Sequence, residues 1–304
     1  MTVTVLMSTY NGEKYLREQL DSIIGQQGVD VRIVIRDDGS TDNTLQILNE
    51  YEEKYDFITI ENDGRNLKPC KSFFKLICEH TDSEYFALSD QDDIWDKDKL
   101  YTAILMLEKF DPEKPVMYFS NLRIVDENNK FYRNSHNIRR DMKNKYRTLI
   151  ETAATGCTIV YNKQLAKIAS KVRPNTFSMH DTWIYMTCAF FGNVVYDFEP
   201  HINYRQHGNN VVGTSLTKRR FPKIKNEVNR FFNRNLQPRF DNAVEFLREF
   251  GTELPEEDLE KVLEIVNYKR TRQSRKQLMN DTDIIPENGF NRFRFRMLIR
   301  LGIV

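Results

Sequence analysis

Short apolar runs alternate with amphipathic segments along the first 95 residues of the chain. The apolar runs are rich in Val, Ile, Leu and Phe, as buried strands are, and they cover residues 3–7, 31–35, 57–60 and 85–88. The intervening segments place apolar side chains at helical spacing and cover residues 13–26, 44–55 and 71–79. Strands that alternate with helices form βαβ units and a largely parallel sheet. The pattern therefore predicts an α/β fold.

The pattern is less regular in the rest of the chain. Further helices are predicted at residues 97–110, 163–171 and 180–191, and further strands at residues 116–119, 122–125, 155–161 and 193–196. Residues 126–147 are polar and basic and are predicted to form a surface excursion. From residue 214 the sequence changes to long amphipathic helical patterns, at residues 218–250 and 256–280. We therefore predict a domain of residues 1–213, with halves of about 1–110 and 111–213, and a helical extension of residues 214–304.

The composition is that of a soluble globular protein, with 40% hydrophobic and 29% charged residues among 304. The net charge of +1 conceals an asymmetry, because residues 214–304 hold 19 Lys and Arg against 13 Asp and Glu, whereas the preceding residues hold 26 against 31. A basic extension favours phosphate-rich partners, either anionic lipid headgroups or nucleic acid. The chain has no run of eighteen apolar residues, no secretion signal and no paired spacing among its four cysteines, so we expect a cytoplasmic protein with reduced thiols.

Two of the predicted strands end in clustered carboxylates. Asp37 and Asp38 follow the second strand, and Asp90, Asp92 and Asp93 follow the fourth. The carboxyl ends of parallel strands meet at one edge of a sheet, where α/β proteins bind ligands. Clustered acids raise one another's pKa unless a cation holds them, and carboxylate oxygens suit Mg²⁺ or Mn²⁺. Acidic turns that lead into the following helices are the alternative.

Five motifs in this order resemble the family 2 glycosyltransferases of the GT-A fold, and the chain lacks the glycine-rich motifs of dinucleotide oxidoreductases and P-loop enzymes. The motifs are Ser8-Thr9-Tyr10-Asn11-Gly12, Asp37-Asp38-Gly39-Ser40-Thr41-Asp42, Asp90-Gln91-Asp92-Asp93-Ile94-Trp95, His180-Asp181-Thr182-Trp183 and Tyr204-Arg205-Gln206-His207-Gly208-Asn209-Asn210. The last two are most similar to the bacterial rhamnosyltransferase branch. The resemblance covers about residues 1–213, and it departs from many relatives at Ser8, where they carry proline. It implies a Rossmann-like, mostly parallel sheet flanked by helices, followed here by a helical basic extension.

The resemblance implies transfer of a sugar from a nucleotide diphosphate to an acceptor hydroxyl, with Mn²⁺ or Mg²⁺ stabilising the departing diphosphate. Asp92 is expected to bind the metal, with Asp90 assisting or binding the ribose. One of Asp37 and Asp38 is expected to accept a hydrogen bond from the base, and Tyr10 either stacks on the base or is a core aromatic. The expected nucleotide-sugar contacts are Thr9, Tyr10, Asn11, Glu13, Asp37, Asp38, Asp90, Gln91, Arg205 and His207. Of these, Arg205 and His207 are expected to reach the diphosphate, and incidental basic residues of a surface loop are the alternative.

Asp181 is the expected catalytic base, since an acceptor hydroxyl must lose its proton as the new bond forms. A single carboxylate base facing the anomeric carbon implies direct displacement with inversion. A plain helix cap is the alternative role for Asp181. Residues expected near the donor sugar or the acceptor are Asp93, Trp95, Gly156, Cys157, His180 and Trp183.

The leading interpretation is an inverting, metal-dependent glycosyltransferase of bacterial surface polysaccharide synthesis. dTDP-rhamnose is the first choice of donor and a UDP-hexose the second, with a glycan or lipid-linked acceptor. A non-catalytic adaptor that binds nucleotide sugars and acts through its basic tail is the alternative, but all three acid sites are intact. Nucleic-acid binding is disfavoured, because acidic residues 253–264 interrupt the basic extension.

Arginine alternates with bulky apolar residues at 290–300 near the end of the chain. One interpretation is an interfacial helix on an anionic membrane, which would place the enzyme on the inner face of the cell membrane. The other is a helix packed on the catalytic domain with a solvated basic face. The sequence leaves both interpretations open.

Overall fold

The computed structural model describes residues 1–135, 144–171, 179–208, 237–286 and 289–302. The chain divides into two compact units. Unit 1 comprises Met1–Ile138, Ala154–Arg173 and Thr187–Leu216, and unit 2 comprises Arg139–Ala153, Pro174–Met186 and Thr217–Val304. The expected boundary at residues 213 and 214 lies outside the described residues. Unit 2 also takes two earlier stretches of chain, which the sequence placed in the catalytic domain.

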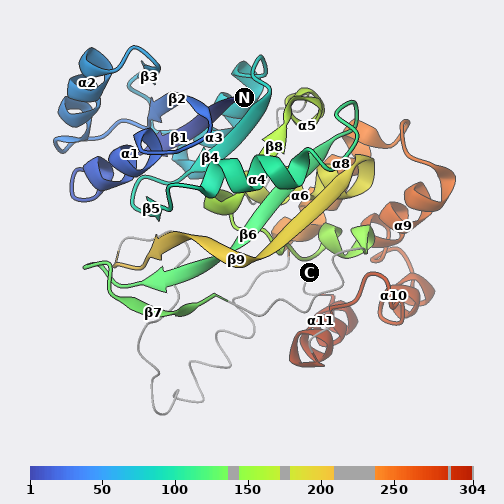
Figure 1. Cartoon of the computed structure of the whole chain (residues 1–304). Coiled ribbons are helices and arrows are strands. Elements are labelled where there is room, and N and C mark those ends of the chain that lie inside the picture. Colours follow the sequence, from blue (N-terminus) through green and yellow to red (C-terminus); the bar gives the residue numbers. More distant parts are fainter. Residues whose placement is uncertain (136–143, 172–178, 209–236, 287–288, 303–304) are drawn as a thin grey trace. The chain divides into compact units, whose positions relative to one another are not determined.

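The four strands predicted in the first 95 residues are present and parallel (Figure 1). They are β1 (Thr2–Thr9), β2 (Asp30–Asp37), β3 (Ile58–Glu61) and β4 (Tyr85–Ser89), and they lie in the order β3-β2-β1-β4. The sheet continues through β8 (Val160–Asn162), β6 (Val116–Val125), β9 (Asn193–Arg205) and β5 (Ile94–Trp95), with β7 (Phe131–Asn134) paired to β6. All nine described strands belong to unit 1.

Helices cover both faces of the parallel strands, which is why these strands are apolar on every side. The helices of unit 1 are α1 (Leu16–Ile24), α2 (Thr44–Lys54), α3 (Lys68–Glu79), α4 (Lys99–Leu107) and α5 (Lys163–Ala169). Alternate β1 residues Val3, Val5 and Met7 share a core with Leu16 of α1. From the opposite face of β1, the Oγ of Ser8 lies 2.6 Å from the Oγ of Ser72 on α3. The predicted α/β architecture is confirmed.

The later strands differ from their predicted bounds. Residues 116–125 form one strand, β6, with an irregular register around Asn121 where it pairs with β9. β9 runs nine residues beyond the predicted 193–196, through a polar stretch that contains Pro200. The predicted strand at residues 155–161 begins instead as a 3₁₀ turn, η2 (Gly156–Thr158). Periodicity missed the continuation of β9 because its residues are mostly polar.

Unit 2 is helical and has its own aromatic core. Within the described residues its helices are η1 (Lys145–Leu149), the start of α6 (His180–Phe191), α8 (Gln237–Phe250), α9 (Glu256–Val266), α10 (Arg272–Leu278) and α11 (Gly289–Leu301). Trp183 stacks on Phe250 with ring centroids 5.6 Å apart, and Asp258 accepts a 2.7 Å hydrogen bond from Lys145. The predicted C-terminal helices are therefore present, although the start of the 218–250 pattern lies outside the described residues. None of the helices in the described ranges is long and apolar enough to cross a membrane.

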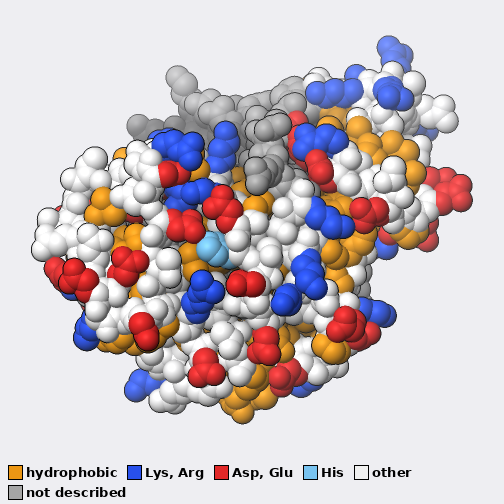
Figure 2. Space-filling model, turned by 90° about the horizontal axis from the view of Figure 1, so that it is seen from above, with side chains coloured by type: hydrophobic (Ala, Val, Ile, Leu, Met, Phe, Trp, Pro, Cys, Tyr) orange, Lys and Arg blue, Asp and Glu red, His pale blue; other side chains and the backbone are white. Residues whose placement is uncertain are grey.

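The apolar residues of α11 point mainly into protein. Phe295, Leu298 and Ile299 are buried, and the Phe295 ring centroid lies 6.4 Å from that of Phe240. Phe293 and Leu301 are exposed. α11 therefore packs within unit 2, and its packing on the catalytic domain stays a prediction. On the described part of the face in Figure 2, acidic and basic side chains are interspersed, with no broad patch of one sign.

Candidate active site

The loops that follow β1, β2 and β4 are bonded together at the carboxyl edge of the sheet. The backbone N–H of Asp38 donates to the carbonyl of Thr9 at 2.8 Å. The side-chain amide of Gln91 accepts from the N–H of Tyr10 at 2.8 Å and donates to its carbonyl at 3.1 Å. The first three of the five motifs therefore meet in unit 1.

Two residues expected to contact the nucleotide brace these loops. Asn11 accepts from the backbone N–H of Thr41 at 2.8 Å, and Glu13 accepts from the backbone and side chain of Asn43 at 3.0 and 2.7 Å. Tyr10 presents a ring that is 46% exposed, so it is not a core aromatic. An exposed ring at this edge is suited to stacking on a base.

Asp37 is fully buried and organises the turn that follows β2. One oxygen accepts from the hydroxyls of Thr9 and Ser40 at 3.0 and 2.6 Å. The other accepts from the backbone N–H groups of Gly39 and Ser40 at 3.1 and 2.8 Å. The Asx-turn interpretation therefore accounts for Asp37, and its contact with a base stays a prediction.

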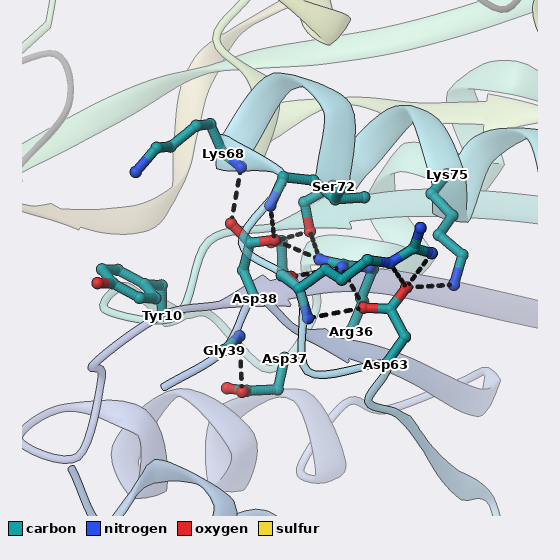
Figure 3. A network of polar contacts seen from close by, with 12 residues as sticks. Tyr10, Arg36, Asp37, Asp38, Gly39, Asp63, Lys68, Ser72 and Lys75 are labelled. Atoms are coloured by element: carbon teal, nitrogen blue, oxygen red, sulfur yellow. Dashed lines mark hydrogen bonds and ion pairs between the residues drawn. The ribbon is translucent and has the colours of Figure 1, made fainter. Parts of the chain in front are cut away.

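Asp38 is also buried, within a network centred on the buried guanidinium of Arg36 (Figure 3). Arg36 pairs with Asp38 through Nη1 and with Asp63 through Nη2, the latter at 2.8 Å. Hydrogen bonds from Arg65, and its charge together with that of Arg36, lower the pKa of Asp63. A buried charge is tolerated only when paired and hydrogen-bonded, and here the pairing fixes the loop after β3 to the end of β2.

The same carboxylate holds the first turn of α3. Asp38 accepts from the backbone N–H groups of Leu67 and Lys68 at 2.7 and 2.8 Å. Protein donors therefore occupy both oxygens of Asp38, and a hydrogen bond to a base stays a prediction for it as well.

Lys68 adopts a left-handed backbone with φ of 70°, a conformation that favours glycine. Replacement of Lys68 by glycine is expected to stabilise unit 1. The left-handed conformation costs a residue that has a Cβ about 1–2 kcal/mol. Glycine avoids this cost but loses about 0.5–1 kcal/mol more in chain entropy on folding. The net increase in the free energy of unfolding is therefore about 0.5–1 kcal/mol. Urea unfolding of the two proteins measures it. Lys71→Gly, in the exposed interior of α3, is the matched control and should destabilise by about 1 kcal/mol. A destabilised Lys68→Gly variant would show that the left-handed backbone is not strained.

Asp92 meets His207 from a different part of the chain. Its Oδ2 lies 2.7 Å from the Nε2 of His207, and its side chain is nearly buried. Burial raises the pKa of the Asp92 carboxyl, against the opposing effect of the hydrogen bond and charge of His207. Asp90 is half-buried and lies near Asp93 and Cys157, with one ligand atom of each within 4.8 Å of the others.

Several residues expected near the donor sugar are buried. Asp93 is fully buried and accepts from the backbone N–H of Arg205 at 3.1 Å. Burial, together with the charges of Asp92 and Asp90, raises its pKa well above the usual range. Trp95 and Cys157 are buried too, and burial raises the pKa of the Cys157 thiol. The contacts of Asp93 are those of a side chain that joins β9 to the β4 loop.

Beside them lies Lys99, which the sequence analysis did not single out. It is fully buried, with its Nζ 3.5 Å from the centroid of the Trp95 ring. Burial lowers the pKa of Lys99 to about 7. Gly156, also buried, opens the 3₁₀ turn that carries Cys157.

Arg205 was expected to reach the donor diphosphate, but its guanidinium is only 3% exposed and bonds to protein. Nε donates to the carbonyl of Asp92 at 2.9 Å, and Nη1 donates to the carbonyl of Glu127 at 2.9 Å. Nη2 pairs with Glu18 on α1. Arg205 therefore fixes the backbone that carries Asp92. Glu18 carries no sequence signal of this contact, because its partner lies 187 residues away.

The remaining site candidates belong to unit 2, at the start of α6. Asp181 lies half-buried in the first turn and accepts from the backbone N–H of Thr182 at 2.6 Å. Burial lowers the pKa of His180 to about 3, so its imidazole is neutral. Trp183 is part of the aromatic core. A catalytic role for Asp181 stays a prediction.

The chain belongs to glycosyl transferase family 2, which it matches over residues 4–168, and it is a nucleotide-sugar-dependent glycosyltransferase. The sequence resemblance is thereby confirmed. Among curated proteins, the chain is similar to dTDP-rhamnosyl transferase RfbG of Shigella flexneri. The two are 33% identical over 234 residues, which cover 69% of this chain and 75% of the relative.

Solved structures support the fold. TarS 1–349 of S. aureus superimposes with a TM-score of 0.58 at 18% identity, covering 100% of this chain and 81% of that one. Its complex with UDP-GlcNAc gives 0.56 at 18% identity, covering 99% and 92%. Mannosyltransferase PcManGT of Pyrobaculum calidifontis, in complex with GDP-Man and Mn²⁺, gives 0.52 at 17% identity, covering 99% and 85%. At these identities the likeness shows a GT-A-like fold.

Proposed function

We propose that this enzyme is an inverting, divalent-metal-dependent glycosyltransferase that moves L-rhamnose from dTDP-rhamnose to a hydroxyl of a glycan or lipid-linked acceptor. The acceptor would belong to a bacterial surface polysaccharide. The observation that carries the proposal is the meeting of Asp92 and His207 at the carboxyl edge of the sheet, 2.7 Å apart. The similarity to a dTDP-rhamnosyl transferase supports this donor.

The residues at this edge fit a divalent cation. A carboxylate oxygen and an imidazole nitrogen are ligands that Mn²⁺ accepts, and the two meet from separate chain segments. Burial disfavours the ionised form of Asp92, and a cation would offset that effect. Asp92 and His207 would hold the metal, and Asp90 is the further expected ligand. The metal would supply positive charge to the departing diphosphate.

The chain's other residues have separate tasks in this proposal. The exposed ring of Tyr10 stacks on the nucleobase. Asp181 takes the proton of the acceptor hydroxyl as that oxygen attacks the anomeric carbon, and the sugar is transferred in one displacement with inversion. Asp181 lies in the first turn of α6.

A UDP-hexose is the second candidate donor, because a structure of similar fold, TarS 1–349, was solved with UDP-GlcNAc. The proposal also places the enzyme at the inner face of the cell membrane. This placement rests on exposed Phe293 and Leu301 of α11, which lie near Arg300 in the sequence.

Calorimetric titration with dTDP, UDP and GDP tests the proposal, each nucleotide with Mn²⁺ and again with EDTA. We expect dTDP to bind most tightly, and binding to weaken in EDTA and return with excess Mn²⁺. Preferential binding of UDP would favour a UDP-hexose over dTDP-rhamnose as the donor. Failure of all three nucleotides to bind would contradict the proposed donor site.

A further inference from the structure

The end of β9 packs against the start of α1 through contacts that the proposed chemistry does not use. Tyr15, immediately before α1, is 9% exposed. The ring of His207 lies against it, with ring centroids 5.0 Å apart and planes inclined by 33°. The guanidinium carbon of Arg205 lies 4.5 Å from the Tyr15 ring centroid. The Tyr15 ring thus packs against both Arg205, at the end of β9, and His207, which follows that strand.

Glu18 completes this support one turn further along α1. It pairs with Arg205, whose other guanidinium nitrogens donate to the backbone carbonyls of Asp92 and Glu127. A buried guanidinium without a carboxylate partner would be strongly unfavourable. The ion pair therefore fixes β9, the loop of Asp92 and α1 together.

His207 needs such support because it lies beyond the end of its strand. β9 ends at Arg205, and the N–H of Gln206 donates to the carbonyl of Val125 at the end of β6, at 2.9 Å. The ring must nevertheless meet Asp92, a residue 115 positions away. Residues that orient a metal ligand without touching the metal commonly determine the affinity of the site for that metal.

We propose that Tyr15 and Glu18 are positioning residues, which hold the imidazole of His207 against Asp92 in the arrangement that binds the divalent cation. This inference rests on the proposed function, because it assigns the cation to Asp92 and His207. It makes the start of α1 part of the metal site without any direct contact with the metal or the sugar.

Mn²⁺ binding, followed by the electron paramagnetic resonance of free Mn²⁺ in the presence of dTDP, tests the inference. Tyr15→Leu removes the aromatic face and is expected to weaken Mn²⁺ binding roughly tenfold, the lower end for outer-sphere partners. Tyr15→Phe keeps the ring and should restore binding to near the wild-type value. Glu18→Leu should weaken binding to a similar degree.

Tyr55→Leu is the matched control. A lysine ammonium lies over each ring, that of Lys14 at 4.8 Å over Tyr15 and that of Lys54 at 4.9 Å over Tyr55, but Tyr55 follows α2 and packs on Phe57. Its replacement should leave Mn²⁺ binding unchanged. Wild-type affinity in Tyr15→Leu, or an equal loss in Tyr55→Leu, would overturn the inference while leaving the proposed function intact. Absence of Mn²⁺ binding by the wild-type protein would overturn both.

Discussion

Replacement of Asp92 by alanine is expected to abolish sugar transfer and to remove the effect of Mn²⁺ on nucleotide binding. The carboxylate is nearly buried and lies 2.7 Å from His207, so its removal takes away one of two adjacent candidate ligands. A metal supplies several kcal/mol of stabilisation to developing charge, which corresponds to a loss of turnover of roughly 10³-fold. Initial rates of transfer and calorimetry with dTDP measure the two effects.

The accompanying variants separate metal binding from local structure. Asp92→Asn keeps an oxygen that can accept from His207, but it lacks the charge, so it should fold like the wild type and still lose turnover. Asp98→Ala is the matched control, because Asp98 belongs to a different carboxylate–histidine group, with Asp96 and His201. It should leave turnover unchanged. If Asp92→Ala retained Mn²⁺-dependent dTDP binding, residues other than Asp92 would be the metal ligands.

The parallel half of the sheet could be predicted from sequence because its strands are buried on both faces. A run such as residues 31–35 is then almost continuously apolar, and it ends abruptly at Asp37. β9 gave no such signal, since its residues past Tyr196 are largely polar and pair with short β5 and the irregular part of β6. A strand of this kind is specified by its neighbours, which a local pattern does not contain.

The motifs located the candidate site but not the direction of its side chains. Asp37 and Asp38 lie at the expected edge, yet both carboxylates already accept hydrogen bonds from neighbouring protein groups. Trp183 lies two residues after the motif acid Asp181 and packs in the core of unit 2. A short motif fixes which residues are present at a turn, whereas burial depends on tertiary packing.

The supports of the site could not be predicted for a related reason. Arg205 resembled a diphosphate ligand because a cation near a nucleotide site suggests that role. Its partner Glu18 sits among ordinary surface acids of an amphipathic helix, and its contact with Arg205 has no periodic signature. Long-range ion pairs of this kind become visible only in the fold.

Replacement of Asp181 by asparagine is expected to abolish transfer while leaving donor binding nearly intact. The amide oxygen can still accept from the N–H of Thr182, so the start of α6 should be retained. The variant lacks a carboxylate able to take the acceptor's proton, and loss of a general base costs roughly 10²–10⁴-fold in turnover. Transfer rates and dTDP affinity, measured on the same preparation, separate catalysis from binding.

A first-turn acid of another helix in unit 2 supplies the control for this variant. Glu256 is exposed at the start of α9, so Glu256→Gln removes a similar favourable interaction with a helix N-terminus. It should change turnover little. If Asp181→Asn kept near-normal turnover, the carboxylate would act only at the start of α6, and the base would have to be another residue. If both variants lost activity equally, the loss would reflect helix stability, because amide substitution removes charge from both helix starts alike.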